Sequence, residues 1–241
     1  MFRRLRVAIG FLTILPVSPR QIEANDFHKS VPFFPMVGIL YGLFTWGIFS
    51  LGRLILPIEV AAWLAVFATA IFNGCIHWDG FADTADGLGS SNPERSRLIM
   101  KDSRLGAFGG MALSFLILGK VLLFPHLIEY SPAVFIAVAI LARWSMAVAI
   151  LTQPSVSQGL AQMFKTADQK PGNLLTASIL MLAGIAFALP QSAILLGLTG
   201  IGLWVWFRFI KQRFGGITGD LLGATNELVE LACYLVLNIK Y

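Results

Sequence analysis

Long apolar segments, separated by short polar connections, dominate the pattern along this chain of 241 residues. Seven of them approach the length of about 17 to 25 residues that a helix needs to cross a bilayer. They occupy residues 33–56, 60–76, 107–127, 133–151, 174–189, 193–207 and 221–239. The pattern predicts an all-α fold, namely a polytopic membrane helix bundle of about seven transmembrane helices.

The first 30 residues differ from these segments. A basic start precedes an apolar stretch at 7–17, which Pro16 and Pro19 close and which is too short to span a bilayer. No small-residue cleavage site of a secretory signal follows it. We therefore expect residues 1–30 to form an interfacial or re-entrant segment of a single integral membrane domain, residues 1–241.

Composition and charge agree with a membrane protein. Hydrophobic residues make up 56% of the chain and charged residues 13%, about half their share in an average soluble domain. The net charge of +5 is dispersed over loops that flank the apolar segments. This dispersal indicates a lipid bilayer rather than nucleic acid as the partner, and an oligomer is compatible with it.

Lysine and arginine in the loops set the predicted orientation, because cytoplasmic loops are enriched in both. With the N-terminus in the cytoplasm, the cytoplasmic segments contain 14 of the 18 Lys and Arg residues, and the outer connections contain none. The 14 are Arg3, Arg4, Arg6, Arg20, Lys29, Arg95, Arg97, Lys101, Arg104, Lys165, Lys170, Arg208, Lys211 and Arg213. The polar motifs described next fall on the same side, so the sequence predicts a cytoplasm-facing active site.

Three aspartates follow the second apolar segment. Asp79, Asp83 and Asp86 stand at i, i+4 and i+7, so a helix places them within about 60° of one another on one face. Carboxylates at a membrane border repel one another, and a hard cation such as Mg²⁺ relieves this repulsion. We predict that the three are catalytic and bind Mg²⁺. The alternative is a solvated polar loop, which has no need of this spacing.

His77 belongs to the same segment and is also a catalytic candidate. On a regular helix it lies about 160° from Asp79, so it does not join the metal face. Two interpretations are equally good: His77 is a general base on the preceding turn, or it is an interfacial histidine whose hydrogen bonds are all made within the protein.

A basic segment follows the aspartates. Cations at 97, 101 and 104 repeat the spacing of the acids and form one stripe if residues 96–105 are helical. Cations beside a metal site are what a pyrophosphate needs. The candidate substrate-binding residues here are Arg97, Lys101, Asp102, Ser103 and Arg104. The alternative is that the cations only fix the orientation of the chain in the membrane.

A second polar segment precedes the last apolar one. Its glycines at 215, 216 and 219 predict a flexible turn, and Thr218 or Asp220 is expected to cap the helix that follows. Asp220 is a further catalytic candidate, and Lys211 is a candidate substrate-binding residue. The predicted catalytic cytoplasmic segments are thus residues 77–106 and 208–220.

Charged residues also occur inside the apolar segments, where they are costly and usually functional. Glu227 and Glu230 lie in the last segment, with Lys120, Arg143 or a cationic group of a ligand as available partners. Glu227 shares a helix face with Asp220, and we take Glu227 and Arg143 as candidate substrate-binding residues. The alternative is a buried structural ion pair.

The polar segments resemble the signature blocks of the cobalamin synthase family, the adenosylcobinamide-GDP ribazoletransferases. The resembling blocks are 77–87 (HWDGFADTADG), 99–106 (IMKDSRLG), 215–220 (GGITGD), 34–38 (FPMVG) and 11–16 (FLTILP). They cover nearly the whole chain in the family's order. Trp78 stands where the family commonly has leucine, and Ala107-Phe108 where a common form has threonine-histidine. Neither change removes a charged candidate.

The resemblance implies a Mg²⁺-dependent, multi-pass enzyme of the bacterial inner membrane. Such an enzyme transfers the adenosylcobinamide phosphoryl group of adenosylcobinamide-GDP to α-ribazole or α-ribazole 5′-phosphate and releases GMP. The product is adenosylcobalamin or its 5′-phosphate, so the reaction is the last assembly step of cobalamin biosynthesis.

Two other functions fit the membrane fold less well. A phospholipid synthase that moves a phosphoalcohol has the longer pattern D-G-x-x-A-R with two further spaced aspartates, and this chain does not match that pattern. A transporter is expected to distribute polar groups through the depth of the membrane and to show repeat symmetry. Most polar groups of this chain collect on one predicted side instead.

Overall fold

The computed structural model describes residues 1–156 and 171–239, which form helices joined by turns and contain no β-strand in these ranges. The first helices are α1 (Phe2–Leu12), α2 (Ala24–Ser30), the 3-10 helix η1 (Val31–Phe33), α3 (Phe34–Gly52), α4 (Ile58–Phe72), α5 (Ile76–Gly87) and α6 (Pro93–Ile99). They are followed by α7 (Ala107–Leu123), η2 (Phe124–Glu129), α8 (Pro132–Thr152), α10 (Pro171–Ile185), η3 (Ala186–Ala188), α11 (Gln191–Phe214) and α12 (Gly219–Leu237). The predicted all-α fold is confirmed. Lys165 and Lys170, two of the predicted cytoplasmic cations, lie outside the described residues.

Several helices have the length and apolarity of membrane spans, which confirms a multi-pass membrane bundle. In the described ranges they are Asn25–Gly52, Ala107–Leu127, Pro132–Thr152 and Gln191–Phe214, with Gly172–Ala188 as a shorter apolar helix. These are 4 spans, or up to 5 if the bent pair α4 and α5 counts as one. The number seven therefore stays a prediction, as does the interfacial position of α1, whose 11 residues are too few to cross.

The predicted second span, residues 60–76, is not one continuous helix. α4 ends at Phe72, and α5 begins at Ile76 with its axis turned by 89°. Gly74 and Cys75 between them have φ of 66° and 60°, in the left-handed region that interrupts a right-handed helix. The dipeptide Asn73-Gly74 is a turn signal that argues against an uninterrupted helix. The bend matters because it lays the polar helix α5 alongside α12.

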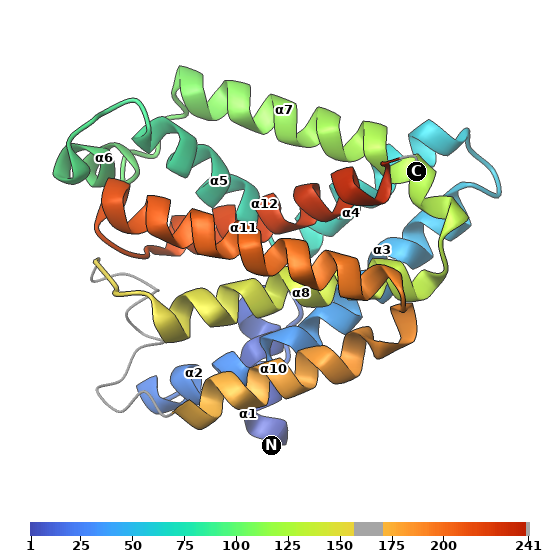
Figure 1. The fold of residues 1–241 in the computed structure, drawn as a ribbon, viewed down its shortest axis with the longest axis horizontal. Coiled ribbons are helices and arrows are strands. Elements are labelled where there is room, and N and C mark those ends of the chain that lie inside the picture. The colour runs from blue at the N-terminus through green and yellow to red at the C-terminus, as the bar shows by residue number, and fades with distance from the viewer. Residues whose placement is uncertain (157–170, 240–241) are drawn as a thin grey trace.

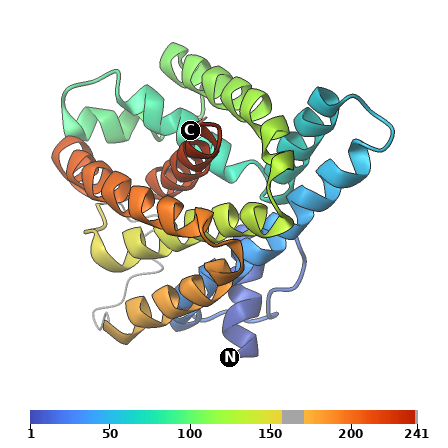
Figure 2. The same ribbon diagram turned by 45° about the vertical axis from the view of Figure 1, so that its right-hand side comes forward.

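Helix α12 runs through the middle of the bundle and contacts α5, α7, α8 and α11 (Figure 1). Seen nearly end-on, it lies between α7 and α11 (Figure 2). The most extensive packing joins α3 to α8, where a Cβ on Gly42 would come within 2.3 Å of Ile136 Cα. Small residues let membrane helices approach closely in this way, and here they hold the scaffold around α12.

Candidate active site

Helices α5 and α12 meet backbone to backbone, and this contact brings the acids of two distant segments together. A Cβ added to Gly80 of α5 would lie 2.8 Å from Asp220 Cα, and one added to Gly223 of α12 would lie 3.0 Å from His77 Cα. Glycine on each helix therefore permits the close approach. As a result Asp220, at the start of α12, lies beside the helix that carries Asp79 and Asp83.

We call Asp79, Asp83 and Asp220 the acid cluster. Burial raises the pKa of Asp83 to about 7, and the negative charges of Asp79, Asp220 and Asp86 add to the shift. Burial and the charge of Asp79 raise the pKa of Asp220 to about 6, against a hydrogen bond from Thr218. Both acids lie outside the predicted apolar segments. The cluster is thus a group of negative charges that repel one another.

Asp86 lies on the same helix, but its carboxylate has different partners. Its two oxygens accept hydrogen bonds from the backbone N–H groups of Gly106 and Gly109, each at 2.8 Å. These groups stand at the start of α7, where unpaired N–H groups and the helix dipole favour a negative charge. A Cβ on either glycine would come within 2.3 Å of a carboxylate oxygen. Gly106 and Gly109 therefore leave the space that the Asp86 carboxylate occupies.

The acid cluster offers carboxylate oxygens, the hard donors that Mg²⁺ prefers. In residues 1–156 and 171–239, no three His, Cys, Asp or Glu side chains converge as a ready-made metal site. None of the three acids of the cluster forms an ion pair with another described residue. Mg²⁺ is usually bound by one or two carboxylates together with substrate phosphates rather than by an all-protein cage. Hard oxygens with surplus negative charge fit that mode of binding.

The basic segment is not the predicted helical stripe. α6 ends at Ile99, so the expectation of a helix over 96–105 is wrong. Asp102 Oδ1 accepts a hydrogen bond from the backbone N–H of Arg104 at 3.1 Å, and such local bonds compete with helix formation. Arg97 reaches across to donate a 2.8 Å hydrogen bond to the carbonyl of Phe214, at the end of α11.

Arg104 and Asp102 form an exposed ion pair on this segment. The guanidinium faces the carboxylate through two nitrogens, with Nη2 and Oδ2 2.6 Å apart. These hydrogen bonds hold the pKa of Asp102 at about 2, so its carboxylate stays ionised and keeps Arg104 oriented. The candidates Lys101, Ser103 and Lys211 are also exposed.

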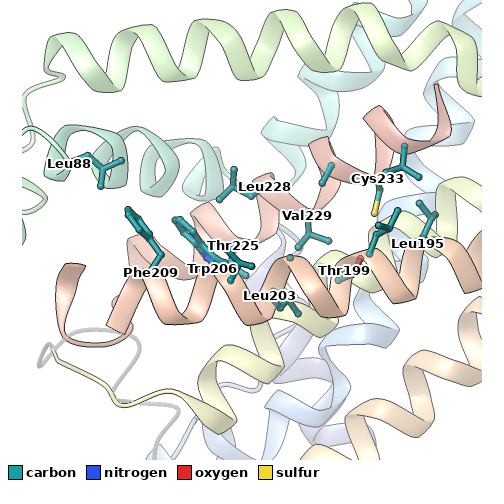
Figure 3. A pocket seen from close by; sticks show the side chains of 15 residues that line it. Leu88, Leu195, Thr199, Leu203, Trp206, Phe209, Thr225, Leu228, Val229 and Cys233 are labelled. Atoms are coloured by element: carbon teal, nitrogen blue, oxygen red, sulfur yellow. The ribbon is translucent and has the colours of Figure 1, made fainter. Parts of the chain in front are cut away.

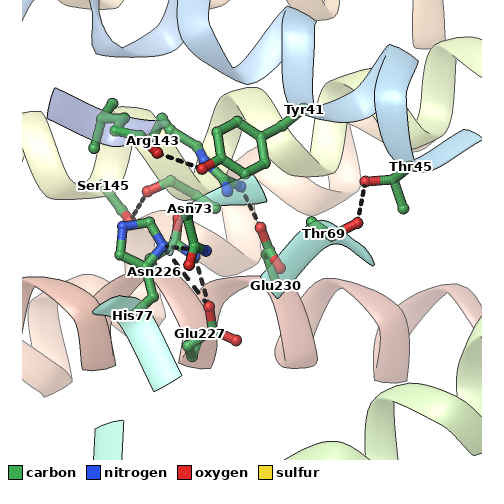
Figure 4. Close-up of polar contacts among 12 residues, drawn as sticks. Tyr41, Thr45, Thr69, Asn73, His77, Arg143, Ser145, Asn226, Glu227 and Glu230 are labelled. Carbon is green, nitrogen blue, oxygen red and sulfur yellow. Dashed lines mark hydrogen bonds and ion pairs between the residues drawn. The ribbon is translucent and has the colours of Figure 1, made fainter. Parts of the chain in front are cut away.

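The charges of the predicted apolar segments form a buried network (Figure 4). Lys120 Nζ lies 2.5 Å from Glu227 Oε2 and 2.7 Å from Glu230 Oε2, and Arg143 pairs with the other oxygen of Glu230. The Arg143 guanidinium also stacks 3.6 Å from the centre of the Tyr41 ring. The predicted partners of the two glutamates are confirmed. The alternative of a structural ion network is favoured over substrate binding for Glu227 and Arg143, because all four charges are buried and paired with each other.

His77 faces this network and not the acid cluster. Its Nδ1 lies 3.3 Å from Asn73 Nδ2 and 3.8 Å from Glu227 Oε1, and its ring is buried. That agrees with its predicted position across the helix from Asp79. Asn73 was missed by sequence reasoning, although a polar residue beside a glycine at the end of an apolar segment marks a helix break.

The turn before α12 is held by a neighbouring segment. Ile217 N–H donates to Pro154 O at 2.7 Å, and Val156 N–H donates to Ile217 O at 3.3 Å. Thr218 Oγ1 then accepts from Leu221 N–H at 3.2 Å, which confirms the predicted cap. Together these bonds fix where α12 begins and hence where Asp220 lies.

Gly80→Ala tests the α5–α12 contact. The new methyl group would meet the Asp220 backbone, so we expect a loss of about 1–3 kcal/mol in unfolding free energy and a large fall in activity as the acids separate. Gly47→Ala is the control, since its Cβ would meet nothing within 4 Å. It should stabilise helix α3 by up to about 1 kcal/mol with unchanged activity. Equal effects of both changes, in denaturant unfolding and turnover assays, would disprove the contact's role.

Comparisons with known proteins agree with these motifs. A family model described as cobalamin-5-phosphate synthase matches residues 4–238. An adenosylcobinamide-GDP ribazoletransferase of Shewanella frigidimarina is 34% identical, over 96% of this chain and 92% of the relative. Relatives of the same name from Desulforamulus reducens and a Polaromonas species are each 36% identical, over 95% and 99% of this chain and 94% and 97% of their own. No solved structure matches this chain.

Proposed function

The chain belongs to the cobalamin-5-phosphate synthase family, and we propose that the acid cluster is the centre of its active site. The protein is an adenosylcobinamide-GDP ribazoletransferase and acts in the final assembly step of cobalamin. In the proposed reaction, a hydroxyl of α-ribazole or its 5′-phosphate attacks the phosphoryl group attached to adenosylcobinamide. GMP leaves, and a new phosphodiester remains.

We place the reaction at the acid cluster because acids from two distant segments lie close together there. Asp79 and Asp83 lie on the helix that contacts Asp220, more than a hundred residues later, and burial together with repulsion raises the pKa of Asp83 to about 7. Uncompensated acids with shifted pKa values are typical of functional sites. Mg²⁺ bound together with a pyrophosphate substrate would supply the positive charge that the cluster lacks.

We propose that Asp79, Asp83 and Asp220 hold Mg²⁺, and that Asp86 instead orders the start of α7. The ion would supply charge neutralisation at the phosphate oxygens. Through its hydrogen bonds to Gly106 and Gly109, Asp86 fixes the position of α7 and of the basic segment relative to α5. The cations of that segment bind the nucleotide phosphates, because cationic side chains offer charge-assisted hydrogen bonds to phosphate oxygens.

GMP release from adenosylcobinamide-GDP by purified protein tests the proposal. Release should require both Mg²⁺ and α-ribazole, and a chelator should stop it. Rapid GMP release without an acceptor would indicate a hydrolase instead. Full turnover with the metal removed would rule out the proposed cofactor.

Arg104→Lys should lower kcat although the charge is kept. Negative charge grows on the leaving phosphate in the transition state, where the planar guanidinium makes a two-pronged contact that an ammonium cannot. We expect a loss of about tenfold, which corresponds to one lost charge-assisted hydrogen bond. Steady-state kinetics on reconstituted protein measures it. Arg95→Lys, also exposed but on α6, is the matched control and should leave kcat unchanged.

We propose the bacterial inner membrane as the location, with the acid cluster facing the cytoplasm, because the basic loops lie on that side of the predicted topology. A cysteine at Ser91, in the exposed turn between α5 and α6, should react only with reagents that reach the cytoplasmic face. The background needs both natural cysteines, Cys75 and Cys233, replaced. A cysteine at Glu59 should react from the opposite side. Labelling of the Ser91 position from the periplasm would show that the chain has the opposite orientation in the membrane.

A further inference from the structure

An apolar groove of about 680 Å³ runs between α11 and α12 (Figure 3). Leu195, Leu203 and Phe209 line it along α11, and Val229 and Val236 line it along α12. The part of α11 from Leu195 to Phe209 is about 21 Å long, since a helix rises 1.5 Å per residue. A bilayer leaflet has a hydrocarbon depth of about 15 Å, half of the full core. The groove is therefore long enough to take a lipid chain.

The polar atoms of the groove are already bonded within the protein. Thr225 Oγ1 donates to Leu221 O at 2.6 Å and accepts from Trp206 Nε1 at 2.9 Å. The Thr199 hydroxyl lies beside the Cys233 thiol of the facing helix. The lining therefore offers shape and apolar contact to a ligand. An apolar chain fits this surface, whereas a polar substrate would lose its hydrogen bonds to water.

One end of the groove carries a positive charge. Leu88 lines that end, and Arg213 Nη2 donates to Leu88 O at 3.0 Å. A guanidinium has five N–H donors, so this bond does not exhaust it. Trp206 and Phe209 stack there with ring centres 5.5 Å apart, and aromatic residues gather at the level of lipid headgroups. The groove thus pairs an apolar slot with a cation at the level of a headgroup.

The groove and the acid cluster lie on different sides of α12. Asp220 and Gly223 face α5, as the close backbone contacts show. Thr225 and Val229 face α11, about 140° and 180° round the helix from Asp220. A molecule in the groove therefore does not lie over the acids, and the groove is not part of the reaction centre.

We propose that this groove binds an anionic phospholipid of the surrounding membrane, with one acyl chain between α11 and α12 and the phosphate at Arg213. The charge at the mouth selects an anionic over a zwitterionic headgroup. The bound chain fills the space that separates α11 from α12, so the lipid contributes to the stability of this helix pair.

Two glycines of α11 provide a matched test. Gly202 lines the groove and Gly200 does not, yet a Cβ at either would meet nothing within 4 Å. Gly202→Phe should fill the groove, and Gly200→Phe should add the same side chain outside it. The full chain is purified in mild detergent and titrated with phosphatidylglycerol or phosphatidylcholine. Bound lipid is counted by native mass spectrometry, and the thermal midpoint is followed in parallel.

The parent and Gly200→Phe should retain phosphatidylglycerol in preference to phosphatidylcholine and gain thermal stability from it. Gly202→Phe should lose the bound lipid and the gain. Arg213→Gln should bind both lipids alike, while Arg20→Gln, an exposed cation elsewhere, should keep the preference. If Gly202→Phe retains as much lipid as the parent, the lipid does not bind in this groove and the proposal is wrong. No preference in the parent, or displacement of the lipid by α-ribazole, would overturn the assignment of its occupant.

Discussion

Asp83→Asn is expected to abolish turnover without weakening the fold. The amide keeps the shape of the side chain but removes the charge that we assign to Mg²⁺ binding. We expect a loss of at least about 10²-fold in kcat, the scale of removing one strong electrostatic interaction with the transition state. The pKa of Asp83 is raised to about 7, so at pH 8 its ionised form destabilises the folded state. Thermal unfolding without Mg²⁺ at pH 8 should therefore show an equal or higher midpoint for the variant.

Asp86→Asn is the matched control, three residues further along the same helix. Here the two carboxylate oxygens each accept from a different N–H group at the start of α7, and the amide replaces one of these oxygens by an NH₂ group that cannot accept. We expect a stability loss of about 1 kcal/mol, as for a weakened helix cap, with turnover largely retained. If Asp86→Asn loses all turnover and Asp83→Asn keeps it, the two roles are assigned the wrong way round.

Glu230→Leu should cause the largest loss of stability in this protein. Glu230 pairs with both Lys120 and Arg143, and all three are buried. Without it, two cations share one carboxylate, Glu227, and one positive charge remains uncompensated inside the bundle. Removing one partner of a buried ion pair costs about 3–5 kcal/mol. Unfolding in detergent by denaturant, followed by circular dichroism, measures this loss.

Adding Arg143→Met to Glu230→Leu should recover most of that stability. The double variant keeps Lys120 paired with Glu227 at 2.5 Å and leaves no unbalanced charge. Apolar replacement of a complete buried pair is often neutral or stabilising. A double-mutant cycle gives the coupling energy, and a double variant as unstable as the sum of the single changes would show that the charges act independently.

The individual helices were largely determined by local sequence. Apolar segments of membrane length predicted most helices, because a buried or lipid-facing helix needs a continuous apolar run. A cap at Thr218 or Asp220 could be predicted because a cap acts within its own turn, and the structure shows that it is Thr218. The dipeptide Asn73-Gly74 is a local turn signal as well. The apolar residues on both sides of it nevertheless favoured the prediction of one continuous helix, so the bend between α4 and α5 was missed.

The chemical character of the site was also readable from sequence, since the spacing of Asp79 and Asp83 fixes a shared helix face. The role of each residue was not. Asp86 has the same spacing and the same chemistry as its neighbours, and only the position of α7 gives it two backbone N–H partners. Arg104 was expected on a helix with Lys101. In the structure its backbone N–H donates a hydrogen bond to the Asp102 side chain instead, in a turn that follows α6.

Sequence alone thus determined the membrane fold, the family and the set of charged candidates, because composition and local spacing act along a single helix. Tertiary structure decided which candidates meet. Gly80 and Gly223 bring α5 against α12, which puts Asp220 beside Asp83 and turns His77 toward Glu227. Such contacts depend on the packing of residues more than a hundred positions apart. No local pattern encodes them, because the free energy that selects them comes from burial and charge pairing across the whole bundle.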